Sequence, residues 1–340
     1  MSMPESVLSV RSSADWRFPS PVGFRTLAII CFAFLVLWQS GSRVEIDRMT
    51  SLTGESILAA VGAGPRSQVA DGLGTVGRQI FPPQISERTE ISRIENFDPD
   101  HLPLFSHIET IETKTETLNP ETLQLEAKSE RARYLVSRFG YLQHVAVKMV
   151  ETLEIALWGT ILAVLIGLPL AILSARNLSG LRPVRFVART LVSLFRAVPE
   201  MISALFLVIA YGFGPIAGVL ALALHAAGFL GKFYAEDIEN ADVKPQEALA
   251  AIGANKIKIL RYAILPQVMP QYVAYTLYIL DRNVRMATVI GLVGAGGIGQ
   301  ELKGRYDMYD YGHVGTILIA IFLVVFLLDQ LSSRLRRAWL

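Results

Sequence analysis

Three charged residues lie in a stretch that is otherwise apolar enough to span a membrane. Asp281, Arg282 and Arg285 occur in the run LDRNVRMATVIGLVGAGGIG, which extends from Leu280 to Gly299. A charge at the bilayer centre costs about 2.5 to 3.5 kcal/mol on insertion scales, so these side chains are expected to face protein or a water-filled cavity. Asp281 and Arg285 are four residues apart, a spacing that favours an ion pair on one helix face. An arginine here also suits bidentate binding of an oxyanion, so both interpretations stay open.

A second pair of opposite charges flanks a proline. Arg196 and Glu200 lie on either side of Pro199 in FRAVPEM, and we expect them to pair. Proline removes one backbone hydrogen bond and kinks a helix, so the segment fits a hinge or cavity wall, or a simple helix end. His225 is a lone histidine in an apolar run, either an interior hydrogen-bonded residue or one that faces a solute path. The candidate path residues are therefore Arg196, Glu200, His225, Asp281, Arg282 and Arg285.

The glycines after this charged stretch match a nucleotide-binding string. Gly294, Gly296 and Gly299 read GxGxxG. A dinucleotide fingerprint, however, follows a strand and opens a helix within a βαβ unit, whereas this string follows an apolar segment of membrane-spanning length. We therefore expect the glycines, Gly297 included, to serve a sharp turn or close helix packing.

Several classes of function find no support in the sequence. The chain has no GxxxxGK[ST] loop, no HExxH motif, no catalytic triad and no spaced carboxylate pair. Its net charge of +2 comes without a basic stripe, which excludes nucleic acid as a partner. We therefore predict no catalytic, metal or cofactor site in this chain.

The elements that carry these residues are predicted to be membrane helices. Of the 340 residues, 52% are hydrophobic and only 18% are charged. Since a span needs about 20 mostly apolar residues, six segments qualify: Phe24 to Gln39, Val150 to Leu173, Phe186 to Tyr211, Pro215 to Tyr234, Val268 to Val293 and Val314 to Leu331. Six spans place both termini on the same side of the membrane.

Arginines indicate which side that is. Cytoplasmic segments carry an excess of Lys and Arg, and three segments are rich in arginine: before the first span (Arg11, Arg17, Arg25), in the second connection (Arg176, Arg182, Arg185, Arg189) and after the last span (Arg334, Arg336, Arg337). The two termini, and the connection from Ala235 to Pro266, are therefore predicted to be cytoplasmic.

The chain divides into three predicted regions. Residues 1–40 hold the N-terminus and the first span, residues 41–145 an extracytoplasmic insertion, and residues 146–340 the main transmembrane domain. From Glu87 to Glu130 the insertion has eleven acids and four bases, and we predict it to be partly disordered. An amphipathic surface helix from about Pro120 to His144 is expected to meet lipid headgroups with its basic residues.

The predicted cytoplasmic connection between spans four and five carries the most specific motif. It reads EALAAIGANKIKILRYAILPQVMP, with two helical pieces separated by Gly253 and an apolar ridge that nothing else in a small loop can cover. The segment resembles the EAA loop of ABC importer permeases, which implies a coupling helix that docks on a separate ATPase. Leu249 replaces the second alanine and Ala263 the preferred isoleucine, and the matching loop residues are Glu247, Ala248, Gly253, Ala254, Leu265 and Pro266.

Four stretches read FRAVPEM, GFGPIAGVLALALHAAGFLGK, GANKIKILRYAILPQVMP and NVRMATVIGLVGAGGIG. Together they look like the phosphonate branch of these permeases, a resemblance that runs from about Val147 to the end. That resemblance implies an all-α, MetI-like membrane fold in a bacterial inner membrane and a homodimer of permeases. It also implies two ATPase subunits that bind ATP and Mg²⁺, and an extracytoplasmic binding protein that delivers phosphonate or a similar oxyanion such as phosphite. Two alternatives stay open: a same-fold permease for another small solute such as an amino acid, and a membrane scaffold that acts through the acidic insertion.

Overall fold

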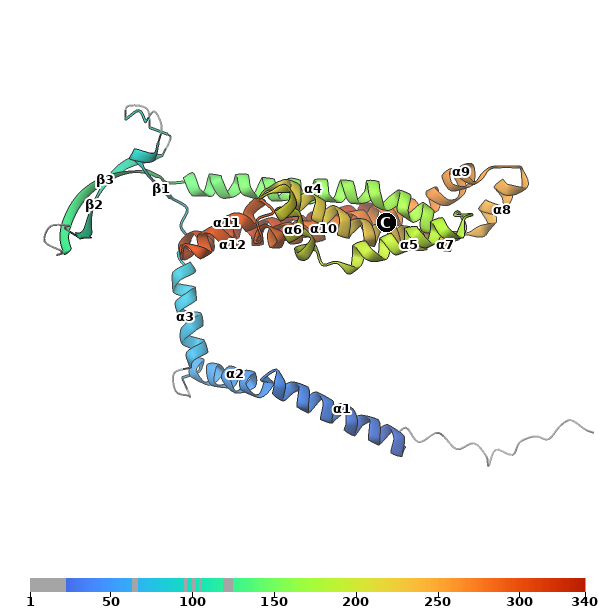
Figure 1. Ribbon diagram of the computed structural model, residues 1–340, viewed down its shortest axis with the longest axis horizontal. Coiled ribbons are helices and arrows are strands. Elements are labelled where there is room, and N and C mark those ends of the chain that lie inside the picture. The colour runs from blue at the N-terminus through green and yellow to red at the C-terminus, as the bar shows by residue number, and fades with distance from the viewer. Residues whose placement is uncertain are drawn as a thin grey trace, which may run out of the picture. The chain divides into compact units, whose positions relative to one another are not determined.

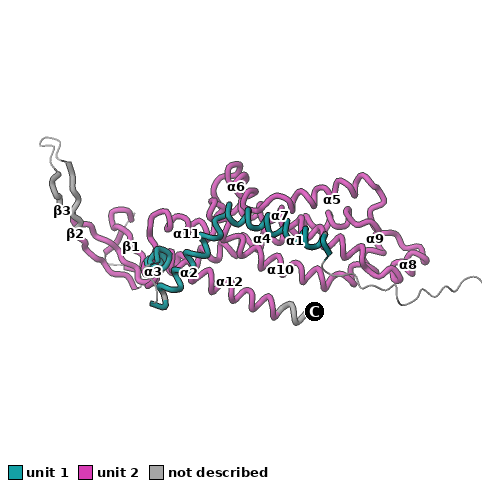
Figure 2. The backbone as a smooth tube through the Cα atoms, turned by 90° about the horizontal axis from the view of Figure 1, so that it is seen from below, with its two compact units in different colours: residues 1–77 teal, residues 78–340 magenta. Residues whose placement is uncertain are grey.

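The computed structural model describes residues 23–62, 67–94, 97–99, 102–103, 105–118 and 125–339. The chain forms two compact units, residues 1–77 and 78–340, which Figure 2 shows in different colours. The first unit contains helices α1 (Phe24–Arg43) and α2 (Ile46–Ala60) and most of α3 (Gln68–Ile80). Arg11 and Arg17, two of the arginines that predict a cytoplasmic N-terminus, lie outside the described residues.

The second unit is a helical bundle built around one small-residue helix. Helix α7 is rich in Ala and Gly, and small side chains let neighbouring backbones approach closely. A Cβ at Gly159 would lie 2.9 Å from the Cβ of Leu222, and one at Gly167 would lie 3.2 Å from that of Leu230. The bundle helices are α4 (Gly140–Ser174), α5 (Arg182–Ala197), α6 (Glu200–Tyr211), α7 (Pro215–Asn240), α10 (Leu265–Gly291), α11 (Gly297–Asp307) and α12 (Tyr311–Trp339).

Four described helices are long and apolar enough to cross a membrane: Thr26–Arg43, α4, α7 and the Tyr311–Arg334 part of α12. A fifth span is possible only as a broken one, because α5 and α6 meet at an angle of 92°. The predicted third span, Phe186 to Tyr211, is therefore not one continuous helix. The bend lies at Val198 and Pro199, since proline cannot continue the hydrogen-bond ladder of α5. Helix α10, which contains most of the predicted span from Val268 to Val293, is not among these candidate membrane-spanning helices. It carries the three charges at positions 281, 282 and 285.

The acidic segment before α4 contains strands. Strands β1 (Glu87–Glu90), β2 (Ser106–Leu118) and β3 (Leu125–Ser137) form an antiparallel sheet in the order β1-β3-β2. The predicted surface helix from Pro120 to His144 is wrong: residues 120–124 lie outside the described part, residues 125–137 form β3, and α4 begins at Gly140. All 13 residues of β3 pair with β2, so cross-strand pairing outweighs any local helical preference.

Opposite ends of α4 carry the two peripheral parts of the second unit (Figure 1). The sheet immediately precedes the N-terminus of α4. At the other end lie α8 (Val243–Ala251), α9 (Lys256–Ile259) and a π-helical turn (Leu260–Ile264) that continues into α10. The Lys256 ammonium donates to the Leu178 carbonyl oxygen at 3.1 Å, which ties α9 to the segment after α4.

Candidate functional site

Three helices bring charged and polar side chains together inside the bundle. Arg282 of α10 donates to the Glu200 carboxylate of α6 and, at 3.0 Å, to Nε2 of His225 on α7. His225 Nε2 lies 3.1 Å from Glu200 Oε1, and His225 Nδ1 donates to the Val198 carbonyl oxygen at 2.9 Å. Both Glu200 and His225 are buried. We call Glu200, His225 and Arg282 the buried triad.

The expected pairing of Arg196 with Glu200 does not occur. The 92° bend directs α6 away from the line of α5, so the two residues are not successive turns of one helix. Glu200 pairs with Arg282 instead, and the Arg196 guanidinium lies 5.6 Å from the ring centre of Phe229. The Arg282 guanidinium lies over the same ring at 4.9 Å, so Phe229 is the common neighbour of both arginines.

Asp281 and Arg285 form the ion pair that their spacing predicts, with Arg285 Nη2 2.7 Å from Asp281 Oδ2. The Asp281 side chain is 6% exposed and that of Arg285 is 47% exposed. Arg285 also lines an open groove of about 660 Å³ between α10 and α12, together with Phe322, Phe326 and Asp329. Arg282, by contrast, belongs to the buried triad.

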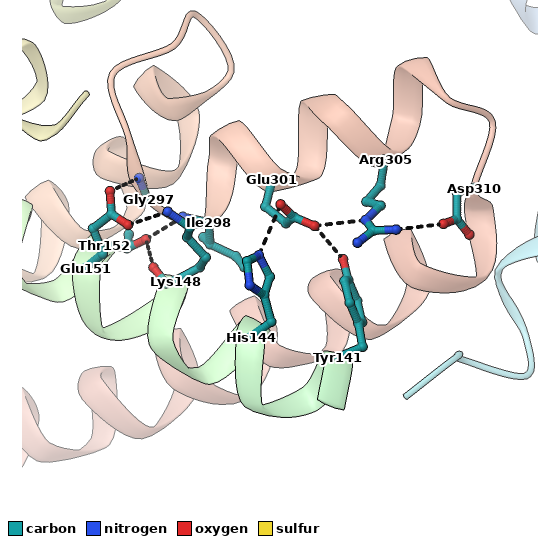
Figure 3. Close-up of polar contacts among 10 residues, drawn as sticks. All are labelled: Tyr141, His144, Lys148, Glu151, Thr152, Gly297, Ile298, Glu301, Arg305 and Asp310. Carbon is teal, nitrogen blue, oxygen red and sulfur yellow. Dashed lines mark hydrogen bonds and ion pairs between the residues drawn. The ribbon is translucent and has the colours of Figure 1, made fainter. Parts of the chain in front are cut away.

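The GxGxxG segment is a turn whose amides are already used (Figure 3). Gly294, Gly296 and Gly297 have φ values of +92°, +85° and +70°, a region that favours glycine. The Gly297 N–H donates to Glu151 Oε1 at 3.0 Å, and the Ile298 N–H donates to the Thr152 hydroxyl at 2.8 Å. Side chains of α4 thus occupy the first amides of α11, where a nucleotide phosphate would have to bind.

Glycine is also needed where α10 and α11 meet. A Cβ at position 299 would overlap the carbonyl oxygen of Thr288, and a Cβ at Gly291 would lie 2.7 Å from the Gly296 carbonyl oxygen. Close backbone approach therefore accounts for both positions.

A polar cluster that sequence analysis missed joins α4 to α11 (Figure 3). The Glu301 carboxylate accepts from Arg305 at 2.8 Å and from Tyr141 at 3.3 Å, and lies 3.2 Å from His144 Nε2. Arg305 continues the cluster to Asp310 at 3.2 Å. Burial opposes ionisation of Glu301, but the hydrogen bonds from Arg305 and His144 outweigh it and lower its pKa. The only indication of this cluster in the sequence is the four-residue spacing of Glu301 and Arg305, which favours an ion pair on one helix face.

The loop that resembles the EAA motif is a helix that no other described segment of the chain covers. Helix α8 is capped by Asp242, which accepts from the Lys244 N–H at 3.1 Å, and it ends before Gly253, whose φ is +82°. Neither α8 nor α9 contains a buried residue, and Ile252 is 79% exposed. Glu247 and Ala248 are exposed on α8, Ala254 is half-buried beyond Gly253, and Leu265 and Pro266 begin α10. The loop thus presents an uncovered helix at the end of the bundle and continues directly into α10.

Comparisons with known proteins agree with this architecture. Residues 167–338 match the family described as "Binding-protein-dependent transport system inner membrane component". The chain is 60% identical over 257 residues to the putative phosphite transport system permease protein HtxE of Stutzerimonas stutzeri, covering 76% of this chain and 98% of that protein. It is 44% identical over 186 residues to the putative permease HtxC of the same organism, covering 55% of this chain and 66% of that one.

The fold also matches a solved structure, described as inward-facing conformations of the MetNI methionine ABC transporter. The TM-score is 0.51 at 24% sequence identity, over 58% of this chain and 96% of that one. The predicted all-α, MetI-like membrane fold is therefore confirmed for the helical bundle, to which the chain adds the three-stranded sheet. The chain belongs to the binding-protein-dependent inner membrane components, the permease subunits of ABC transporters, which are not themselves enzymes.

Proposed function

We propose that this chain is the permease subunit of an ABC importer for a small phosphorus oxyanion, phosphite or a phosphonate. The observation that carries the proposal is the 60% identity to HtxE across 98% of that protein. Arg282 supports it, because a guanidinium offers two parallel donors to an oxyanion. The ion pair with Glu200 keeps this charge neutralised while no anion is present.

The uncovered α8 is the proposed docking site for an ATPase subunit, which binds the ATP and Mg²⁺. Ile252, the exposed apolar residue directly after α8, needs a partner surface, and the chain continues from α9 through the π-helical turn into α10. A displacement of α8 is thereby transmitted to the helix that carries Arg282. The same proposal places both termini and α8 on the cytoplasmic side, and the binding protein at the end that carries α11.

The importer is proposed to contain two permease chains of this family. A second copy of this chain is one candidate partner. The other is a related permease, since HtxE and HtxC are both described as phosphite transport permeases of one organism. Native mass spectrometry of the purified complex distinguishes two identical chains from two different ones.

The proposal is tested by ATP hydrolysis in the reconstituted complex. Binding proteins loaded with phosphite, a phosphonate, phosphate or methionine are added in turn, and the rate is compared with that of the unloaded proteins. Stimulation by phosphite or phosphonate supports the proposal, whereas stimulation by methionine alone favours an amino acid permease. If deletion of residues 87–130 abolishes function while Arg282→Gln does not, the scaffold interpretation is favoured instead.

A further inference from the structure

A cationic pocket lies beside the buried triad, between the end of α4, α5 and the second half of α7. Its volume is about 340 Å³, about ten times the share of a water molecule in the liquid. Four cationic side chains line it (Arg176, Arg189, Arg196 and Lys232), with two carboxylates (Glu236 and Glu239). The lining therefore carries two more positive than negative charges.

The two carboxylates leave one arginine without an ion pair. Glu239 Oε1 lies 2.5 Å from Arg189, and Glu239 also accepts from the backbone N–H of Arg176 at 2.8 Å. Lys232 lies 3.5 Å from Glu236. Within the described part of the chain, Arg196 has no carboxylate within 4.0 Å, and its guanidinium makes a cation–π contact with the Phe229 ring at 5.6 Å. Arg196 is thus the pocket cation that the described carboxylates leave without an ion pair, whereas the Arg176 guanidinium lies 4.0 Å from Glu239.

A buried hydroxyl in the same wall also lacks a partner. Ser174 is 2% exposed and lines the pocket, and its Oγ has no hydrogen-bond partner among the described residues. A buried hydroxyl without a partner costs about 1–3 kcal/mol, so native structures seldom leave one. An anion in the pocket would accept this hydrogen bond.

The pocket adjoins the proposed solute path through one side chain. Phe229 carries Arg282 of the buried triad on its ring at 4.9 Å and Arg196 of the pocket at 5.6 Å. The pocket extends from Arg196 toward Glu239 and Arg176, near the ends of α7 and α4. That is the end of the bundle at which α8 and α9 lie.

We propose that this pocket binds the transported oxyanion after it leaves the buried triad and before its release at the α8 end. Arg196 and Lys232 supply the charge, Ser174 donates its hydroxyl, and the anion competes with Glu239 for Arg189. The inference rests on the proposed function for the identity of the anion. The surplus charge, the unpaired arginine and the orphan hydroxyl are independent of it.

The test is direct binding of phosphite to the permease–ATPase complex without binding protein, in nanodiscs of zwitterionic lipid, measured by calorimetry. We expect Arg196→Gln and Lys232→Gln each to weaken binding by about tenfold, and Ser174→Ala by roughly fivefold. Arg182→Gln is the matched control, because Arg182 is an exposed arginine of α5 outside the pocket lining, and its affinity should equal that of the wild type.

A second arm repeats the titration with anionic phosphatidylglycerol present, and native mass spectrometry records retained lipid. Wild-type phosphite binding that the pocket variants weaken supports the inference. Equal affinity in all variants overturns it, as does wild-type retention of phosphatidylglycerol with no phosphite binding. If one variant fails to assemble, the other two decide. If the phosphite-loaded binding protein stimulates ATP hydrolysis but phosphite does not bind in the pocket, only this inference is wrong. If phosphite binds in the pocket but ATP hydrolysis is not stimulated, only the proposed function is wrong.

Discussion

Arg282 and Glu200 form an ion pair between α10 and α6, although 82 residues separate them in the chain. His225 completes the contact from α7, so three helices meet at one buried triad. Removing one partner of a buried pair leaves the other charge uncompensated, which costs more than removing both. The buried triad therefore fixes the relative position of the three helices and also neutralises the charge of Arg282.

We expect Glu200→Gln to lower the free energy of unfolding by about 2 kcal/mol, because the half-buried Arg282 then loses its carboxylate partner. The double variant Glu200→Gln with Arg282→Gln should recover at least half of that loss. Unfolding in mixed micelles measures both. Asp307→Asn is the control. It removes one carboxylate charge, as Glu200→Gln does, but Asp307 pairs with Lys303 on an exposed helix face. The coupling would be contradicted if the double variant lost as much free energy of unfolding as the Glu200→Gln and Arg282→Gln variants lose in sum.

Gly253→Val should reduce association with the ATPase at least tenfold without unfolding the permease. The φ of +82° at this position is strained for valine, so the direction of α8 relative to α9 changes, while no neighbour lies close enough to clash. Copurification and the Tm of the isolated permease separate the two effects. Gly304→Ala, at an ordinary helical position with open space around it, should leave association unchanged. Retained association in the valine variant would argue against docking at α8.

Gly299→Ala should destabilise the permease by about 3 kcal/mol or more, because the new methyl group overlaps the Thr288 carbonyl oxygen and forces α11 away from α10. Gly304→Ala in the same helix should cost nothing or stabilise slightly. Thermal unfolding of the two variants gives the comparison. Similar Tm values would show that close packing at position 299 is not required.

The Glu301 cluster predicts a specific pH dependence. The pKa of Glu301 is lowered in the folded protein by its hydrogen bonds. The ionised carboxylate therefore stabilises the fold above its unfolded pKa of about 4.3. This contribution is lost as the pH falls through the folded pKa. Glu301→Gln should therefore lower the Tm at pH 7, and the difference from wild type should shrink on acidification toward pH 3. A Tm difference that does not depend on pH would mean that the carboxylate acts by shape alone.

Local patterns in the sequence predicted much of the helical framework. The apolar run from Pro215 to Tyr234 lies within α7, and the spacing of four between Asp281 and Arg285 gives the observed ion pair. Gly253 separates two helical pieces as expected. Each of these features depends on residues within a few turns of one another.

The features that were missed depend on long-range contacts. Nothing near Glu200 indicates that its partner is Arg282, because the bend after α5 must first redirect α6. Strands β2 and β3 are polar, so hydrophobic alternation gives no signal. The Thr-Lys-Thr-Glu-Thr run at residues 113–117 has strand-forming threonines at alternate positions, which was the one available indication.

The most direct test of the central claim is ATP-driven accumulation of radiolabelled phosphite in proteoliposomes that contain the permease, its ATPase and the binding protein. We predict uptake that requires ATP on the α8 side, falls at least tenfold in Arg282→Gln, and is unchanged in Arg182→Gln. Accumulation of methionine but not of phosphite or a phosphonate by the same vesicles would contradict the account.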